Sequence, residues 1–137
     1  MNTPTTCGSE DRTAKPEPAD APYNSTDAAR TARIRALNDA LRRDFAGGRV
    51  LMTNGIDALG DETASRVLDA IRGFEEFNED NDPFGLHDCA LMDVEGVAEK
   101  VMFKIDAYDR RLECHSPDEA DPAVTTRVMT VLLASEY

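Results

Sequence analysis

The chain has 137 residues, a formal net charge of −12 at neutral pH and an apolar fraction of 41%. This length predicts one domain with a single core, and the composition is typical of a globular protein rather than a disordered one. A surface of this sign repels phosphate groups, so direct nucleic-acid binding is disfavoured and a protein partner with a basic surface is expected.

Three cysteines, Cys7, Cys89 and Cys114, stand at irregular spacing. An odd, irregular set does not predict a disulfide framework, so a reducing cytoplasm is the expected location. The N-terminal residues have no apolar core, which argues against a signal peptide, and no apolar run approaches the roughly 20 residues that cross a bilayer. We expect residues 1–25 to form a flexible polar tail and residues 26–137 to form a single domain.

The first half of the domain predicts two helices around one strand. A helix is expected from about Ser25 to the glycines at 47 and 48, with a buried face formed by Ile34, Leu37, Leu41 and Phe45. Residues 49–53 predict a strand and residues 56–59 a helical turn. Residues 61–74 predict a second amphipathic helix.

The second half predicts strands followed by a closing helix. Residues 89–94 and 97–108 are expected to pair across a turn at Glu95 and Gly96, with Val101, Phe103, Ile105 and Ala107 on the core face. Residues 111–114 predict a short strand. A helix is expected from Pro122 because Val124, Val128, Val131 and Leu132 recur at helical spacing. The predicted fold is α+β, a small antiparallel sheet of three to four strands packed against about three helices.

Charge is divided sharply along the chain. Nine carboxylates and no Lys or Arg lie between residues 73 and 99, whereas six arginines lie between residues 30 and 49. Asp-Pro and Phe-Gly within residues 82–85 predict a structured loop in the acidic segment. We expect a basic partner to bind this loop and the outward strand face, through Glu75, Glu76, Glu79, Asp80, Asp82, Lys104, Asp106 and Tyr108.

A His/Asp cluster offers an enzymatic alternative. A hairpin would bring His87 and Asp88 towards Asp106 and Asp109, and an imidazole beside carboxylates can act as a general base or hold a divalent metal in a small hydrolase. No nucleophile motif or phosphate-binding loop accompanies these residues. Turn carboxylates that accept backbone N–H bonds explain the same pattern, so no catalytic residue, metal or cofactor is assigned.

The arginine-rich first helix offers a third hypothesis, nucleic-acid binding, because several guanidinium groups along one helix can contact phosphates. Asp39 lies four residues from both Arg35 and Arg43, a spacing that also suits surface ion pairs. The overall negative charge favours the ion-pair interpretation.

Three segments carry a resemblance to a known family. They are NEDNDPFGLHD at 78–88, FKIDAYD at 103–109 and SPDEADPAVTTRV at 116–128, with the closing Glu136 and Tyr137. In this order they resemble a family of small uncharacterised bacterial proteins, catalogued as domain of unknown function 3768, which is common in alphaproteobacteria and often encoded on plasmids. The resemblance extends from about residue 36 to residue 137 and implies no activity.

The plasmid association of the family suggests a role in mobile elements. By analogy, a non-enzymatic acidic protein of this kind is a candidate inhibitor of a host nucleic-acid defence complex such as CRISPR. The identity of the partner and the oligomeric state do not follow from the residues.

Overall fold

The structure is a computed structural model that describes residues 25–137. The expected flexible tail lies, up to residue 24, outside the described residues. Helix α2 (Ser25–Asp44) is followed by strand β1 (Gly48–Met52), a single turn α3 (Asn54–Asp57) and helix α4 (Asp61–Arg72). These elements agree with the order predicted for the first half of the domain. None of the helices in the described part of the chain is long and apolar enough to cross a membrane.

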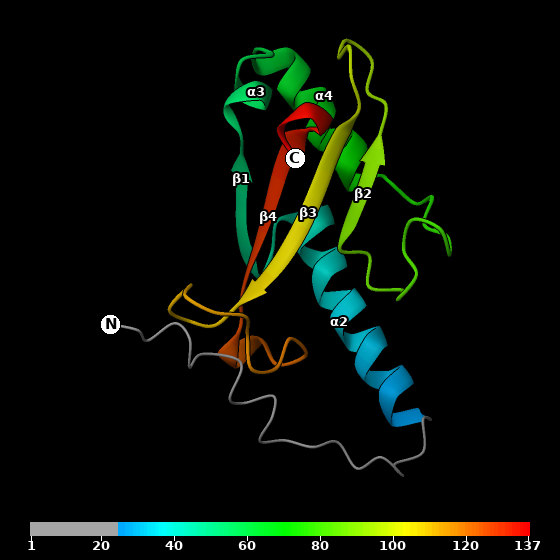
Figure 1. The fold of residues 1–137 in the computed structure, drawn as a ribbon, viewed down its shortest axis with the longest axis vertical. Helices are drawn as coiled ribbons and strands as arrows, with labels where there is room; N and C mark the ends of the chain where they lie inside the picture. The colour runs from blue at the N-terminus through cyan, green and yellow to red at the C-terminus, as the bar shows by residue number, and fades with distance from the viewer. Residues whose placement is uncertain (1–24) are drawn as a thin grey trace.

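Four strands form one sheet in the order β1-β4-β3-β2 (Figure 1). Strands β2 (Cys89–Met92) and β3 (Val101–Tyr108) pair antiparallel, and β3 also pairs antiparallel with β4 (Thr126–Leu133). β1 pairs parallel with β4, so the sheet is mixed rather than wholly antiparallel. The predicted α+β class is confirmed, with β3 and β4 central and β1 and β2 at the edges.

The core lies between one face of the sheet and the two long helices. Leu41 of α2 and Val67 and Ile71 of α4 pack with Phe103 of β3 and Val131 of β4, and all five side chains are inaccessible to solvent. In Figure 1, α2 and α4 lie behind the sheet, and no α-helix of the described residues covers its front face. The predicted alternation along β3 is confirmed, because Val101, Phe103, Ile105 and Ala107 are buried.

The closing helix predicted from Pro122 is wrong. Only Pro122–Val124 forms a short 3-10 turn, η2, and Thr126–Leu133 is the central strand β4. β4 is buried on both faces between β1 and β3, and such a strand reads as a continuous apolar run without alternation. The spacing of its valines therefore resembled a helix, although its content of β-branched threonine and valine favours a strand.

Two smaller predictions for the second half also need correction. The predicted turn at Glu95 and Gly96 is present, because Val97 donates to the carbonyl of Val94 (3.0 Å), but it lies within a longer loop of residues 93–100. β3 begins at Val101 rather than at residue 97. Residues 111–114 do not form a strand. The carboxylate of Asp109 accepts N–H bonds from Arg111 (3.1 Å) and Glu113 (3.0 Å), which folds the segment into a tight turn.

The chain closes on a last short turn, η3 (Ala134–Glu136), that fastens β4 to the start of α3. The Glu136 carboxylate accepts hydrogen bonds from the Thr53 hydroxyl (2.6 Å) and from the backbone N–H groups of Gly55 (2.9 Å) and Leu133 (2.8 Å). A side chain at position 55 would collide with this carboxylate, so the close approach requires a glycine there.

Candidate functional site

An acidic loop (residues 73–88) connects α4 to β2 and is tied to α2 along its length. Arg35 donates through Nε to the carbonyl of Gly85 (2.8 Å), and Asn38 donates through Nδ2 to the carbonyl of Leu86 (2.9 Å). Near the start of the loop, Arg43 pairs with Glu75 at 2.9 Å. The acidic loop is therefore an ordered loop, as the Asp-Pro and Phe-Gly pairs predicted.

Side chains inside the acidic loop also fix its shape. The side-chain oxygen Oδ1 of Asn78 accepts the backbone N–H groups of Asp80 (2.8 Å) and Asn81 (3.0 Å). The Asp82 carboxylate accepts those of Leu86 (3.0 Å) and His87 (3.2 Å), and only 5% of the Asp82 side chain is exposed. Asp82 thus serves the loop itself and is not on the outer surface where the sequence placed it.

His87 is held by a cluster of side chains from α2 and the acidic loop. Its ring stacks on Phe77 with centroids 3.9 Å apart, and its Nδ1 lies 2.9 Å from a carboxylate oxygen of Asp39. Its Nε2 lies 3.7 Å from the Asp82 carboxylate. His87 has a φ of +54°, in the left-handed region, where a non-glycine residue persists only if its surroundings hold it.

The guanidinium of Arg42 is the last member of this His87 cluster and binds Asp39 together with His87. It donates to Asp39 (2.7 Å) and to the carbonyls of Ile71 and Phe74 (2.9 Å each) at the end of α4, and it is wholly buried. Partial burial raises the pKa of Asp39, but hydrogen bonds from Arg42 and His87 outweigh that effect and hold the pKa below its usual value. Asp39 therefore stays ionised between two cationic or hydrogen-bonding neighbours.

The four residues of the predicted His/Asp cluster do not converge as one set. Asp88 and Asp106 are close enough to influence each other electrostatically, but Asp106 pairs with Lys104 at 2.7 Å. Asp109 caps its own turn, and His87 faces Asp39 of α2. In the part of the chain that the structure describes, no group of three or more His, Cys, Asp or Glu side chains is arranged to hold a metal ion.

The ionised form of Asp88 is disfavoured in the folded protein. Burial raises the pKa of its carboxyl above the usual value, and the nearby carboxylates of Asp82, Glu119 and Asp106 add to the rise. A folded pKa above the unfolded one means that the folded protein binds the proton more tightly. Stability therefore falls as pH rises from the unfolded pKa, about 3.9, through the folded value.

Replacing Asp88 by asparagine is expected to raise the unfolding temperature at about pH 7 and to leave it unchanged at about pH 3, where both side chains are neutral. Thermal unfolding followed by circular dichroism at the two pH values measures the effect. Asp69→Asn, on the exposed side of α4, removes one negative charge without this environment and serves as the control. A lower unfolding temperature for Asp88→Asn at neutral pH would show that the ionised carboxylate stabilises the fold.

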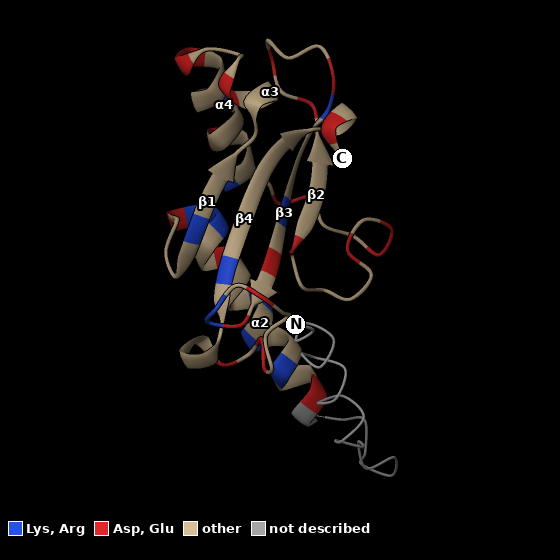
Figure 2. Ribbon diagram, turned by 60° about the vertical axis from the view of Figure 1, so that its left-hand side comes forward, with Lys and Arg blue, Asp and Glu red and all other residues tan. Residues whose placement is uncertain are grey.

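The residues predicted to bind a partner fall on two surfaces. Glu76, Glu79 and Asp80 are exposed on the acidic loop and form no ion pair with any described residue. This loop lies beyond β2 in Figure 2, where it carries acidic segments and no basic one. The other surface is the face of β3 that points away from the helices, which presents three half-buried side chains: Lys104, Asp106 and Tyr108.

All five arginines of α2 make contacts within the chain. Arg30 pairs with Asp118 (2.9 Å), and Arg33 donates to the carbonyl of Ala120 (2.6 Å). The other three hold the acidic loop and the end of α4, as described above for Arg35, Arg42 and Arg43. The helix predicted as a possible phosphate-binding surface thus uses its guanidinium groups to fasten neighbouring segments.

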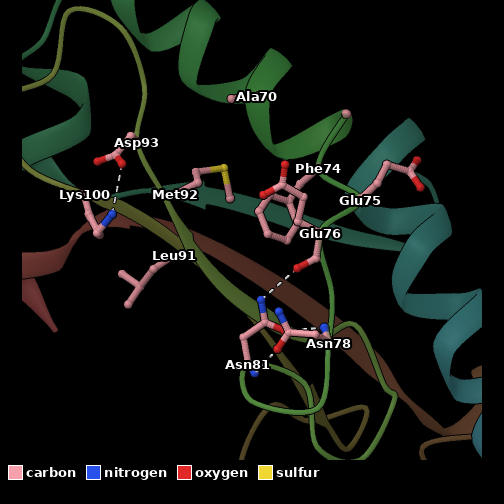
Figure 3. Close-up of a pocket in the computed structure, with 11 residues that line it drawn as sticks. Ala70, Phe74, Glu75, Glu76, Asn78, Asn81, Leu91, Met92, Asp93 and Lys100 are labelled. Atoms are coloured by element: carbon pink, nitrogen blue, oxygen red, sulfur yellow. Dashed lines mark hydrogen bonds and ion pairs between the residues drawn. The ribbon is translucent and has the colours of Figure 1, made fainter.

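A groove of about 580 Å³ lies between the acidic loop and β2 (Figure 3). The Asp93–Lys100 ion pair (3.0 Å) stands at one end and the turn at Asn78 and Asn81 at the other. Its remaining lining comes from α4, the acidic loop and β2: Ala70, Gly73, Phe74, Glu75, Glu76, Leu91 and Met92. Sequence reasoning found the acidic wall of this groove but not the groove itself.

The family assignment agrees with the predicted resemblance. A family described as Protein of unknown function (DUF3768) matches residues 52–136. The chain belongs to this family. The match includes the acidic loop, β2 and the groove between them, whereas the α2 residues that hold the loop precede it. No curated protein and no solved structure matches the chain.

Sequence reasoning missed how three residues of α2 face the loop: Asn38, Asp39 and Arg42. Asp39 was expected to pair with Arg35 and Arg43, but it pairs with Arg42 and His87. Asn38 and Arg42 lie one position beyond Leu37 and Leu41, so they share the buried side of the helix. Polar residues next to an apolar stripe were the available signal. The Asp39–Arg42 pair is local, but the other partners of these residues lie more than 25 positions further along the chain and could not be inferred from spacing.

Proposed function

We propose that this protein is a non-enzymatic interaction module that binds a basic protein surface through Glu76, Glu79 and Asp80 of the acidic loop. The observation that carries the proposal is that these three carboxylates are exposed and unpaired among the described residues, on a loop held in shape by Arg35, Asn38 and Asp82. A held loop loses little conformational entropy on binding, which favours affinity.

The distribution of positive charge supports the same function. The five α2 arginines contact carboxylates or carbonyls of the chain itself. Their positive charges are therefore partly neutralised, and their side chains are held in these contacts. The surface beyond β2 keeps its negative potential. A basic partner would be steered to it by long-range attraction, with a rate of association that falls as salt is added.

A narrower form of this function follows from the chemistry of nucleic-acid complexes. Proteins that hold nucleic acid expose basic channels that neutralise phosphates. An acidic loop of fixed shape can compete for such a channel, which is how an inhibitor of a host nucleic-acid defence complex such as CRISPR would act. A metal-dependent hydrolase has less support, because the four candidate side chains are divided between separate contacts.

Charge reversal tests the proposed function. The triple variant Glu76→Lys/Glu79→Lys/Asp80→Lys is expected to reduce capture of a basic partner from a lysate of the source cells by about tenfold or more, and moderate salt should weaken capture by the wild type. The matched control is Asp69→Lys/Glu95→Lys/Glu113→Lys, at three other exposed positions. Each triple changes the net charge by +6, from −12 to −6. Equal capture by the two triples would rule out a specific role for the loop.

A further inference from the structure

Strand β2 is an edge of the sheet, and no strand of the described residues pairs with its outer side. Ile105 of β3 donates to the carbonyl of Asp88 (2.7 Å), so the residues that bond to β3 are Asp88, Ala90 and Met92. The alternation of an antiparallel ladder then turns the N–H and C=O groups of Cys89 and Leu91 outward. Among the described residues, none of the hydrogen bonds outside the strand ladders pairs these outward groups.

Strand β2 contains none of the residues that usually deter pairing with another strand. Exposed edge strands commonly carry charged residues, prolines or bulges that deter a further strand. β2 has the sequence Cys-Ala-Leu-Met, and half of the Leu91 surface is exposed. The outward backbone groups and the apolar side chain of Leu91 thus form an accessible template of about two residue pairs.

The groove beside β2 separates this edge from the residues of the acidic loop that face it. Leu91, Met92 and Asp93 form one side, and Phe74, Glu75 and Glu76 stand opposite (Figure 3). A volume of about 580 Å³ lies within the range of roughly 300–1,000 Å³ that is typical of ligand sites. An added strand would lie about 4.8 Å from β2, within this space.

The charged side chains that line the groove favour a positively charged ligand. Its lining contains three carboxylates, Glu75, Glu76 and Asp93, and one cation, Lys100. Lys100 is paired with Asp93 and Glu75 with Arg43, which leaves Glu76 to attract a positive charge. The opposite edge strand, β1, contains Arg49 and no carboxylate, so a basic segment would favour β2.

We propose that the partner binds as an extended basic segment that adds a fifth strand to the sheet along β2. The backbone of the segment pairs with the outward groups of Cys89 and Leu91, and a Lys or Arg side chain contacts Glu76. This inference rests on the proposed function and deepens it, because it names the mode of binding: strand addition gives affinity through main-chain hydrogen bonds, and the acidic wall gives preference for a basic sequence.

The test uses the full chain and a defined probe, a peptide of about ten residues that alternates Lys with Val, a length that covers a typical strand. Amide hydrogen exchange is expected to slow by about tenfold or more at Leu91 when the peptide binds. The matching Glu-Val peptide is expected to give no protection. If the Lys-Val peptide does not bind, or binds without protecting the Leu91 amide, the strand-addition inference is overturned.

Two variants separate this inference from the proposed function. Leu91→Pro removes the outward N–H while leaving the bonds to β3 in place, and proline is tolerated at such edge positions. It is expected to weaken binding of the Lys-Val peptide by about tenfold or more, whereas Leu91→Ala, which keeps the N–H, retains more of the binding. Unfolding curves of both variants establish that each is folded.

If the loop triple variant loses its partner but Leu91→Pro does not, the acidic loop binds without strand addition, and only the further inference fails. If neither variant affects binding, both proposals fail. Protection of Leu91 that grows with protein concentration in the absence of peptide would show that a second copy of the chain occupies the edge, which also overturns the inference.

Discussion

Replacing Arg42 by methionine is expected to lower the free energy of unfolding by about 3–5 kcal/mol. The guanidinium is wholly buried and donates to Asp39 of its own helix and to the carbonyls of Ile71, in the last turn of α4, and Phe74, just beyond it. It also lies over the rings of Phe77 and Phe103, at 5.2 and 5.9 Å from their centroids. Methionine fills much of the volume but removes the donor of four acceptors: the Asp39 carboxylate and the carbonyls of Ile71, Arg72 and Phe74.

Urea unfolding of the two proteins measures this loss. The matched control is Arg43→Met at the next position, where a half-exposed guanidinium pairs with an exposed Glu75 and the expected change is at most about 1 kcal/mol. Arg42→Lys is expected to fall between the wild type and Arg42→Met, since a lysine cannot reach all of these acceptors. Equal losses at positions 42 and 43 would mean that the buried network contributes nothing beyond a surface ion pair.

Replacing Asn38 by leucine is expected to lower the free energy of unfolding by about 2–4 kcal/mol. The Asn38 amide donates to the carbonyl of Leu86 in the acidic loop (2.9 Å), and its oxygen accepts from Nε of Arg127 (2.9 Å). Only 4% of Asn38 and 3% of Arg127 are exposed, and burial lowers the pKa of Arg127. Leucine keeps the size of the side chain but removes one partner of a buried cation, which is the costly part of the change.

The control for this variant is Asn54→Leu, at an exposed asparagine that makes no side-chain hydrogen bond with the described residues. That substitution is expected to change stability by at most about 0.5 kcal/mol. Asn38→Leu is also expected to speed amide exchange at Leu86 and His87, because the acidic loop loses one of its attachments to α2. Faster exchange confined to α2 and β4 would show that Asn38 serves the core and not the loop.

These contacts give the charge divide of the chain a structural meaning. The sequence shows an arginine-rich segment followed by an acidic one, and it is natural to read them as two separate charged surfaces. In the folded chain the arginines of α2 turn towards the loops that follow and hold them. The carboxylates of Glu76, Glu79 and Asp80 remain exposed. The arginine-rich helix therefore holds the acidic loop in the shape that exposes them.

Strong local signals are what made much of the fold predictable. Caps, glycines and the period of the apolar residues placed α2, β1, α3 and α4, and alternation identified the core face of β3. β4 was missed because both of its faces are buried, which removes the alternation that marks a strand. Its parallel pairing with β1 depends on contacts between residues about 80 positions apart, which no local pattern records.

The family, the α+β class and the acidic character of the loop could be read from the sequence alone, because composition, motif order and turn chemistry are local properties. Which of the charged side chains are free depends on the folded chain. The tertiary structure turned Asp82 inward onto backbone N–H groups, set His87 against Asp39, and placed the loop beside the open edge of β2. The physical reason is that a charged side chain is neutralised by neighbours in space, and those neighbours come from distant parts of the chain.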